Sequence, residues 1–275
     1  MIEENIGATL FDRRRKPISL MPGVKALEVE IRDLSARLHK LRRALRASSE
    51  QVGQTVSFVC QHALTATVSP QIVRALAAYG GTAVRVLSGN QDECLMRLVS
   101  RDVDFAIMYV IPGRSQPEIG SAFDAVTVGA DLLVPVCTPE MRVRVHRNAI
   151  PTIDYPPEVF LGQVVAQTIV PRLPEGTSIK PIAETALTLA MLQLVLSDIG
   201  IAWLPHSLIA GHLAQGVLDR VDEALPAQPL NIRLVRLSEA QTEQSEHTWQ
   251  DLIKQLKSLI EKTDYGTPGT GFTLK

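Results

Sequence analysis

Between residues 54 and 109, short apolar runs alternate with longer amphipathic ones. The runs TVSFVC, VRVLSG and DFAIMY have the length of strands, whereas Ser69–Tyr79 and Gln91–Arg101 have helical spacing. This alternation predicts the βαβαβ pattern of a parallel sheet that helices cover on both faces. Because such sheets bind small molecules outside the carboxyl ends of their strands, we expect a ligand near Cys60, Gln61 and His62, where the first strand ends.

A second pattern lies upstream, and it is the most regular in the chain. Its apolar residues are spaced three and four apart, as in the heptad seam of a coiled coil, and they are Val24, Leu27, Ile31, Leu34, Leu38, Leu41 and Leu45. A helix packed on its own domain would show the same stripe. The basic turn before it and the polar hinge at 48–51 offer no core to cover, so the pattern favours a partner helix.

The composition is that of a folded protein with no strong bias of charge. A length of 275 residues with 45% hydrophobic residues and a net charge of -1 predicts about two domains. No apolar run is long enough to cross a bilayer, and the start MIEENIGATL lacks the features of a secretory signal, so we expect a cytoplasmic protein without membrane contact. The three cysteines are widely spaced and odd in number, which favours reduced thiols over a disulfide framework.

A basic run, Arg13, Arg14, Arg15 and Lys16, follows Leu10-Phe11 near the start, and taken alone it would be a solvated loop. The segment IEENIGATLFDR that leads into it resembles the closing part of the winged helix-turn-helix domain of LysR-type transcriptional regulators, where a recognition helix leads into Leu-Phe and a basic wing. The resemblance implies DNA contacts by these four residues. It also implies that this sequence lacks the base-reading surface, because Met1 stands where most of the family's recognition helix has already passed.

From about Gln54 the chain resembles the effector-binding module of the same family, and the segment DIGIAWLP at 198–205 is similar to its Gly-x-Gly-(Ile/Val)-Ala-x-Leu-Pro motif. The implied fold is α/β, with two Rossmann-like lobes of the type II periplasmic-binding-protein fold joined by crossing strands, here expected at Ala130–Cys137 and Asn231–Leu237. The resemblance implies a winged-helix remnant at 1–23, a linker and dimerisation helix at 24–50, lobe one at 51–130 and 238–262, lobe two at 131–237 and a flexible tail at 263–275.

In lobe two we expect strands at Phe160–Gln163 and near Ile179–Glu184, and we expect a final helix over Glu243–Ile260 that returns to lobe one.

Polar residues at strand ends are the candidates for effector binding. A sheet of this topology would bring them to one crevice, and they are Gln61, His62, Thr65, Asn90, Tyr109, Gln163 and Thr185. Each alone also has a structural interpretation, since His62 would suit a buried histidine bonded to backbone and Asn90 or Ser69 a helix cap. Their joint placement favours a small polar or anionic effector between the lobes.

Motifs for chemistry are missing from the sequence. There is no Gly-x-Ser-x-Gly, His-x-x-x-His or Cys-x-x-Cys, and the tail GTPGTG has neither a preceding strand nor a closing Lys-Ser or Lys-Thr. We therefore expect no enzyme activity, no metal and no cofactor. Cys60, Cys94 and Cys137 lack the spacing of a paired redox switch, and the methionines resemble core residues.

These observations together predict a LysR-type transcriptional regulator, or its regulatory fragment, that senses a small molecule. Its partners would be DNA, through a complete winged domain, a small-molecule effector and further copies of itself in a homodimer or homotetramer. Three alternatives stay open. They are a regulator of the same family that senses oxidation of methionine or cysteine, a solute-binding protein of the same fold, and an interaction protein that pairs through its helix without binding DNA.

Overall fold

The computed structural model describes residues 55–77, 83–114, 122–144, 149–222, 224–238 and 243–260, together with residues 3, 6–12, 19–27, 30, 34, 38 and 41. The chain divides into two compact units, Met1–Gly53 and Gln54–Lys275. Among the described helices, none combines the length and the apolar character that a membrane crossing needs.

The first unit contains a small hairpin and the leucine stripe. Strands β1 (Phe11–Asp12) and β2 (Ser19–Leu20) pair antiparallel, and helix α2 (Pro22–Ala26) follows them. The basic run at 13–16 lies outside the described residues, as do Ile31 and Leu45. The four described leucines of the stripe, Leu27, Leu34, Leu38 and Leu41, are 48%, 66%, 52% and 56% exposed, and the last three are helical. A single chain therefore leaves this part of the stripe open to solvent.

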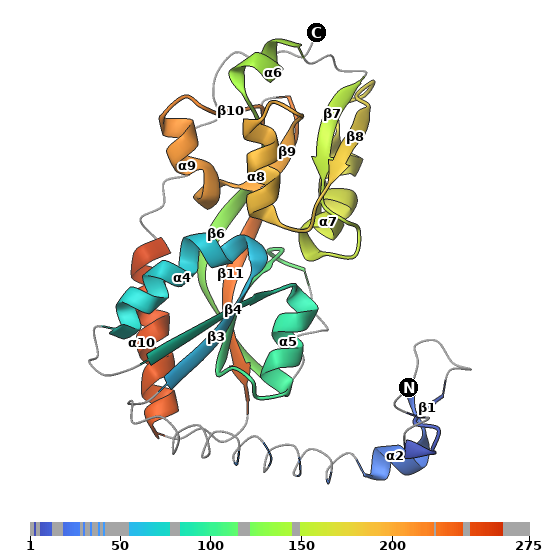
Figure 1. Cartoon of the computed structure of the whole chain (residues 1–275), viewed down its shortest axis with the longest axis vertical. Helices are drawn as coiled ribbons and strands as arrows, with labels where there is room; N and C mark the ends of the chain where they lie inside the picture. The colour runs from blue at the N-terminus through green and yellow to red at the C-terminus, as the bar shows by residue number, and fades with distance from the viewer. Residues whose placement is uncertain are drawn as a thin grey trace. The chain divides into compact units, whose positions relative to one another are not determined.

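Lobe one, in the second unit, has the predicted βαβαβ order (Figure 1). Strand β3 (Thr55–Gln61) lies between β4 (Ala83–Gly89) and β5 (Phe105–Val110) and is parallel to both. Side chains of β3 alternate between two cores, with Phe58 and Cys60 on the face that α4 (His62–Ala77) covers and Val59 on the face that α5 (Gln91–Val99) covers. This two-sided burial explains why the strands are apolar nearly throughout.

The predicted start of the first helix at Ser69 is wrong, because α4 begins at His62 and contains Pro70 in its interior. Leu64, Val68, Ile72 and Leu76 are buried at a spacing of four, so one continuous stripe packs on the sheet across the proline. Pro70 has no N–H to bond the carbonyl four residues earlier, which belongs to the exposed residue Ala66. Packing of the stripe outweighs the missing bond.

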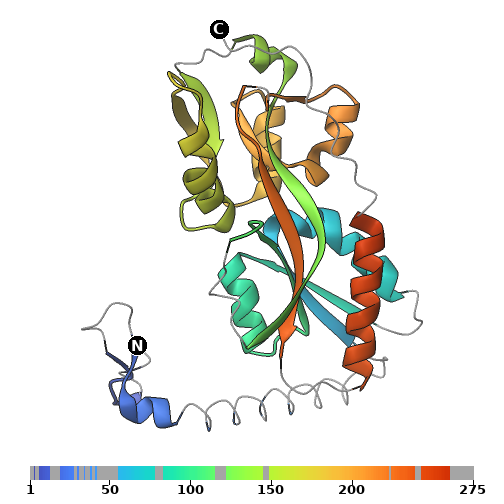
Figure 2. The same ribbon diagram turned by 180° about the vertical axis from the view of Figure 1, so that it is seen from behind.

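Two long strands connect the lobes (Figure 2). Strands β6 (Phe123–Cys137) and β11 (Gln228–Leu237) pair antiparallel along ten residues of β11, with a register shift between Ile232 and Arg233. Both strands begin earlier than predicted, β6 at Phe123 and not at Ala130, and β11 at Gln228 and not at Asn231. The order in the large sheet is β10-β6-β11-β5-β3-β4, with β9 also on β6.

Lobe two is built around the far half of β6. Strands β9 (Ala202–Pro205) and β10 (Asp219–Arg220) pair with β6, and β7 (Ile150–Asp154) pairs in parallel with β8 (Ile179–Glu184). The helices are α6 (Pro139–Arg144), α7 (Phe160–Val164), α8 (Thr188–Leu196) and α9 (His206–Ala214), with a π turn at Val165–Ile169 and a 3₁₀ turn at Val170–Arg172.

Two predictions about the later elements have opposite outcomes. The strand predicted at Phe160–Gln163 is wrong, since these residues form α7. The final helix is confirmed as α10 (Glu243–Ile260), which packs on α4 and β6 in lobe one.

Candidate functional site

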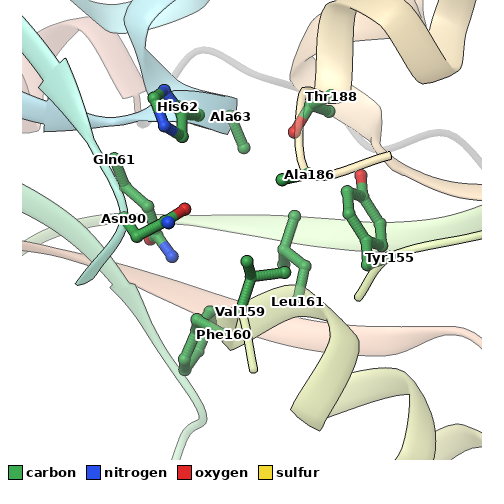
Figure 3. A pocket seen from close by; sticks show the side chains of 10 residues that line it. All are labelled: Gln61, His62, Ala63, Asn90, Tyr155, Val159, Phe160, Leu161, Ala186 and Thr188. Atoms are coloured by element: carbon green, nitrogen blue, oxygen red, sulfur yellow. The ribbon is translucent and has the colours of Figure 1, made fainter. Parts of the chain in front are cut away.

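A pocket opens between the lobes, where the carboxyl ends of β3 and β4 face the starts of α7 and α8 (Figure 3). It holds about 250 Å³ of empty space, its open mouth included. Lobe one contributes Gln61, His62, Ala63 and Asn90, and lobe two contributes Tyr155, Val159, Phe160, Leu161, Ala186 and Thr188. The parallel sheet and its covering helices place these residues, because strand ends and helix starts alternate at this edge.

Gln61 ends β3, and the neighbouring strand holds its side chain. It is buried, and its side-chain oxygen accepts a hydrogen bond of 2.9 Å from the backbone N–H of Tyr109 on the neighbouring strand β5. That bond fixes the direction of the amide, because the oxygen is already in use. The amide nitrogen is the remaining donor group of this side chain.

His62 begins α4 and belongs to a chain of polar side chains. Its Nδ1 lies 2.7 Å from the Ser88 hydroxyl, which lies 2.8 Å from the Thr65 hydroxyl. These contacts join the first turn of α4 to the end of β4 and orient the imidazole at the pocket. Asn90, another lining residue, is the N-cap of α5, and its backbone N–H donates a hydrogen bond to the Glu93 carboxylate.

The lobe-two wall contains a buried hydroxyl, that of Tyr155. Tyr155 is only 6% exposed, and its hydroxyl makes no hydrogen bond of normal geometry with the described residues, although the Thr188 hydroxyl lies beside it. Burial raises the pKa of Tyr155, and the nearby Thr188 hydroxyl offsets this only in part, so the phenol stays neutral and keeps its proton to donate. A buried hydroxyl without a partner costs free energy, and a ligand that accepts its hydrogen bond would recover it.

The charges around the pocket favour a negative ligand. The first residues of α4 and α8 and the N-cap of α5 line it, so the positive ends of three helices lie at this space, although the Glu93 carboxylate already caps α5. None of the ten lining residues carries a carboxylate. Within the described part of the chain, no group of three His, Cys, Asp or Glu could hold a metal ion.

Of the seven residues predicted from the sequence, Gln61, His62 and Asn90 line the pocket, and their role in binding stays a prediction. The other four lie elsewhere. Thr65 bonds to Ser88, and Tyr109 is fully buried behind Gln61. Gln163 is exposed on α7, where its amide donates to the Glu158 carbonyl, and the Thr185 hydroxyl accepts the N–H of Leu187.

Tyr155 and Thr188 were not predicted. Tyr155 follows β7, and Thr188 opens α8 after a three-residue loop. The β-branched residues Ile150, Thr152 and Ile153 are the signal that could have identified this strand.

None of the three cysteines lines the pocket, and all are free and buried. Burial is the main cause that raises the pKa of both Cys94 and Cys137 to about 12. Burial also raises the pKa of Cys60. These thiols are protonated at neutral pH and shielded from solvent.

Residues 49–257 match the protein family described as the LysR substrate binding domain. Among curated proteins, the HTH-type transcriptional regulator YjiE of Escherichia coli K12 is 22% identical over 240 residues, which cover 85% of this chain and 77% of that protein. The HTH domain-truncated transcriptional regulator QseD of Escherichia coli O157:H7 is 20% identical over 225 residues, which cover 79% of this chain and 90% of that protein.

Solved structures show the same fold at similar distance in sequence. Full-length HypT from Salmonella typhimurium, a hypochlorite-specific LysR-type transcriptional regulator, has a TM-score of 0.66 and 21% identity, covering 95% of this chain and 86% of that one. DarR of Vibrio fischeri, solved in complex with DNA, has a TM-score of 0.63 and 23% identity, covering 92% of this chain and 86% of that one.

Proposed function

The chain belongs to the family of LysR-type transcriptional regulators, and on that premise we propose that it controls transcription in response to a small anionic effector bound in the pocket between its lobes. The buried, unpaired hydroxyl of Tyr155 carries the proposal. Tyr155 lines a pocket that has three helix N-termini and no carboxylate among its lining residues, and this environment favours an acceptor with negative charge.

The effector is small. Its pocket is small, because much of the empty space of about 250 Å³ is open to solvent at the mouth. A short carboxylate or an inorganic oxyanion is the class of effector that we propose. The apolar residues Val159, Phe160 and Leu161 on one side would accept a short carbon chain.

DNA binding and self-association complete the proposed function. The basic run at 13–16 would meet phosphates, as a wing does, and the exposed leucine stripe would pair with the same helix of a second chain. A homo-oligomer would then place several basic runs along one DNA molecule.

A thermal-shift screen tests the effector. The probes are sodium salts of short mono- and dicarboxylic acids and of inorganic oxyanions, with the corresponding neutral amides as the uncharged set. We expect an anion, and not its amide, to raise the melting temperature. Tyr155→Phe should weaken that anion about 10- to 100-fold, since a hydrogen bond to a charged group contributes roughly 1.5–3 kcal/mol.

The control is Thr177→Val, which removes another buried, unpaired hydroxyl of lobe two that does not line the pocket. Affinity in this variant should equal that of the unmodified chain. If neutral amides bind as well as anions, or if Tyr155→Phe binds the anion normally, the proposed effector class is wrong.

The alternative of redox sensing gains no support from the thiols, which are buried and protonated. Met96 is exposed on α5, but it does not line the pocket. Neither the thiols nor the position of Met96 therefore favours oxidation over ligand binding.

A further inference from the structure

A buried carboxylate lies where the two lobes join. Asp131 is on the crossing strand β6, is 2% exposed, and accepts four hydrogen bonds. Two come from hydroxyls, those of Tyr109 and Ser207, each at 2.5 Å. Two come from backbone N–H groups, that of Ser207 at 3.1 Å and that of Leu132 at 2.8 Å. A charge this deep is tolerated because every strong acceptor site is used.

The donors come from different lobes. Tyr109 belongs to β5 in the sheet of lobe one, whereas Ser207 lies in the first turn of α9 in lobe two. The positive end of α9 faces the carboxylate, which strengthens the contact from the lobe-two side. We call Tyr109, Asp131 and Ser207 the Asp131 cluster. In this cluster, one residue of each lobe donates to the same carboxylate on β6.

The cluster is next to the irregular part of the crossing strands. Tyr109 pairs with Ile232 of β11, and the register of β11 on β6 shifts between Ile232 and Arg233. Asp131 pairs with Leu230, two residues away from Ile232. A bulge bends and twists a strand pair locally, so this is the place where a small change in the sheet alters the angle between the lobes.

The cluster also touches the pocket through one residue. The same Tyr109 whose hydroxyl donates to Asp131 donates its backbone N–H to Gln61, which lines the pocket. A ligand that binds the Gln61 amide therefore acts on a side chain bonded to the cluster.

We propose that the Asp131 cluster sets the angle between the lobes and that Gln61 couples this angle to the occupancy of the pocket. The second half rests on the proposed function, because it needs an effector. The first half concerns the free protein. Loss of one donor weakens the contact between the lobes, and a hydrogen bond to a charged group corresponds to about a 10- to 100-fold change in the ratio of two arrangements.

Distances between spin labels test the first half in the full chain without any ligand. Met96 on α5 and Val143 on α6 are 63% and 80% exposed, so Met96→Cys with Val143→Cys gives one label in each lobe. The native thiols are buried and stay unlabelled. Dilution with unlabelled chain leaves only distances within one molecule.

Tyr109→Phe and Ser207→Ala each remove a hydroxyl donor while the carboxylate keeps other partners, so the fold is retained. We expect each variant to shift or broaden the distance distribution. The control is Asp124→Asn, which alters a carboxylate of the same strand that bonds Arg236 and Ser238. It should leave the distribution unchanged. Unchanged distances in both cluster variants, with circular dichroism intact, would overturn the proposal.

Gln61→Met tests the link between Gln61 and the cluster, on which the coupling depends. It removes the acceptor of the Tyr109 N–H, and we expect the same shift as in Tyr109→Phe, with the double variant shifting less than the sum of the two. A normal distribution in Gln61→Met, or strictly additive shifts, would refute the coupling. Both arms are read without an effector, so failure to find an anion in the screen bears only on the proposed function.

Discussion

Asp198 adopts a backbone conformation that few residues other than glycine adopt. Its φ is 60°, just after α8, where the sequence resembles a family motif with glycines. Its carboxylate accepts a hydrogen bond of 2.5 Å from Thr138 and pairs with Arg144. These bonds offset the strain, which explains why aspartate is tolerated there.

The strain and the bonds can be separated by two substitutions. Asp198→Gly and Asp198→Ala both lose the bonds, but only alanine keeps the strained φ, so the glycine variant should be about 1 kcal/mol more stable in urea unfolding. The control is the same pair of substitutions at Ser100, whose φ is -73°. There the glycine variant should be no more stable than the alanine variant. Equal stability of the two Asp198 variants would show that φ costs nothing there.

The thiols provide a test of the redox alternative. With pKa values of about 12, Cys94 and Cys137 are ionised in only about one molecule in 10⁴ at pH 8. We expect Ellman's reagent to leave the native chain unreacted and to count three thiols in urea. A thiol that reacts within seconds in the native protein would support the redox interpretation.

At the residue scale, the sequence was informative where position follows from a strand end. Gln61 and Asn90 could be placed at one edge because parallel strands share their carboxyl ends. Tyr109 follows the same rule, yet its side chain lies in the core, where its hydroxyl donates to Asp131 on the next strand, β6. Tyr155 depends on how the lobes meet, which no local pattern contains.

Among the elements, α7 depends on a single glycine. A Cβ atom at Gly162 would lie 2.0 Å from the Pro156 carbonyl oxygen, so the helix packs directly on the turn before it. This close approach fixes Phe160 and Leu161 at the pocket. The sequence suggested a strand here because a five-residue helix is too short to show a helical period.

Gly162→Ala should therefore destabilise the chain by about 1–3 kcal/mol, because the helix must move away from Pro156. Gly211→Ala is the matched control, since it lies inside α9 and its Cβ would meet nothing within 4 Å. It should stabilise by about 0.5–1 kcal/mol. Urea unfolding measures both, and a neutral Gly162→Ala would mean that the turn at Pro156 yields easily.

The leucine stripe makes a prediction about assembly. Leu34→Lys with Leu38→Lys would place two charges in a helix interface. We expect the oligomer to dissociate into a smaller one or into monomers. Glu30→Lys is the control, because Glu30 is exposed on the same helix and is not part of the stripe. Light scattering gives the masses. An unchanged mass for the leucine variant would place the interface elsewhere.

The large elements were more predictable than the pocket. The βαβαβ order and α10 could be predicted because the spacing of apolar residues within each run indicates its secondary structure. The start of α4 was missed because Pro70 looks like a helix start, and only the packing of residues on both sides of it on one sheet shows otherwise.

At the scale of the whole molecule, charge limits what these 275 residues can do with DNA. The chain has 28 Lys and Arg against 29 Asp and Glu, so no general attraction to phosphate exists. What the sequence offers is the basic run of four at 13–16. Side chains of this kind meet phosphates or the minor groove, whereas bases are read mainly by a helix in the major groove.

We therefore predict weak binding to DNA without useful preference for sequence. With three or four phosphates neutralised per chain, the slope of log K against log salt would be about -3 to -4, and an oligomer would multiply it without adding specificity. Arg14→Ala with Arg15→Ala should reduce the slope by about 2 per chain, while Lys180→Ala, an exposed cation of lobe two, should leave it unchanged. The measurement is a titration of labelled promoter DNA and a scrambled duplex at two or more salt concentrations. Tight binding that prefers the promoter at physiological salt would show that residues within this chain read bases, because phosphate contacts alone cannot distinguish the two duplexes.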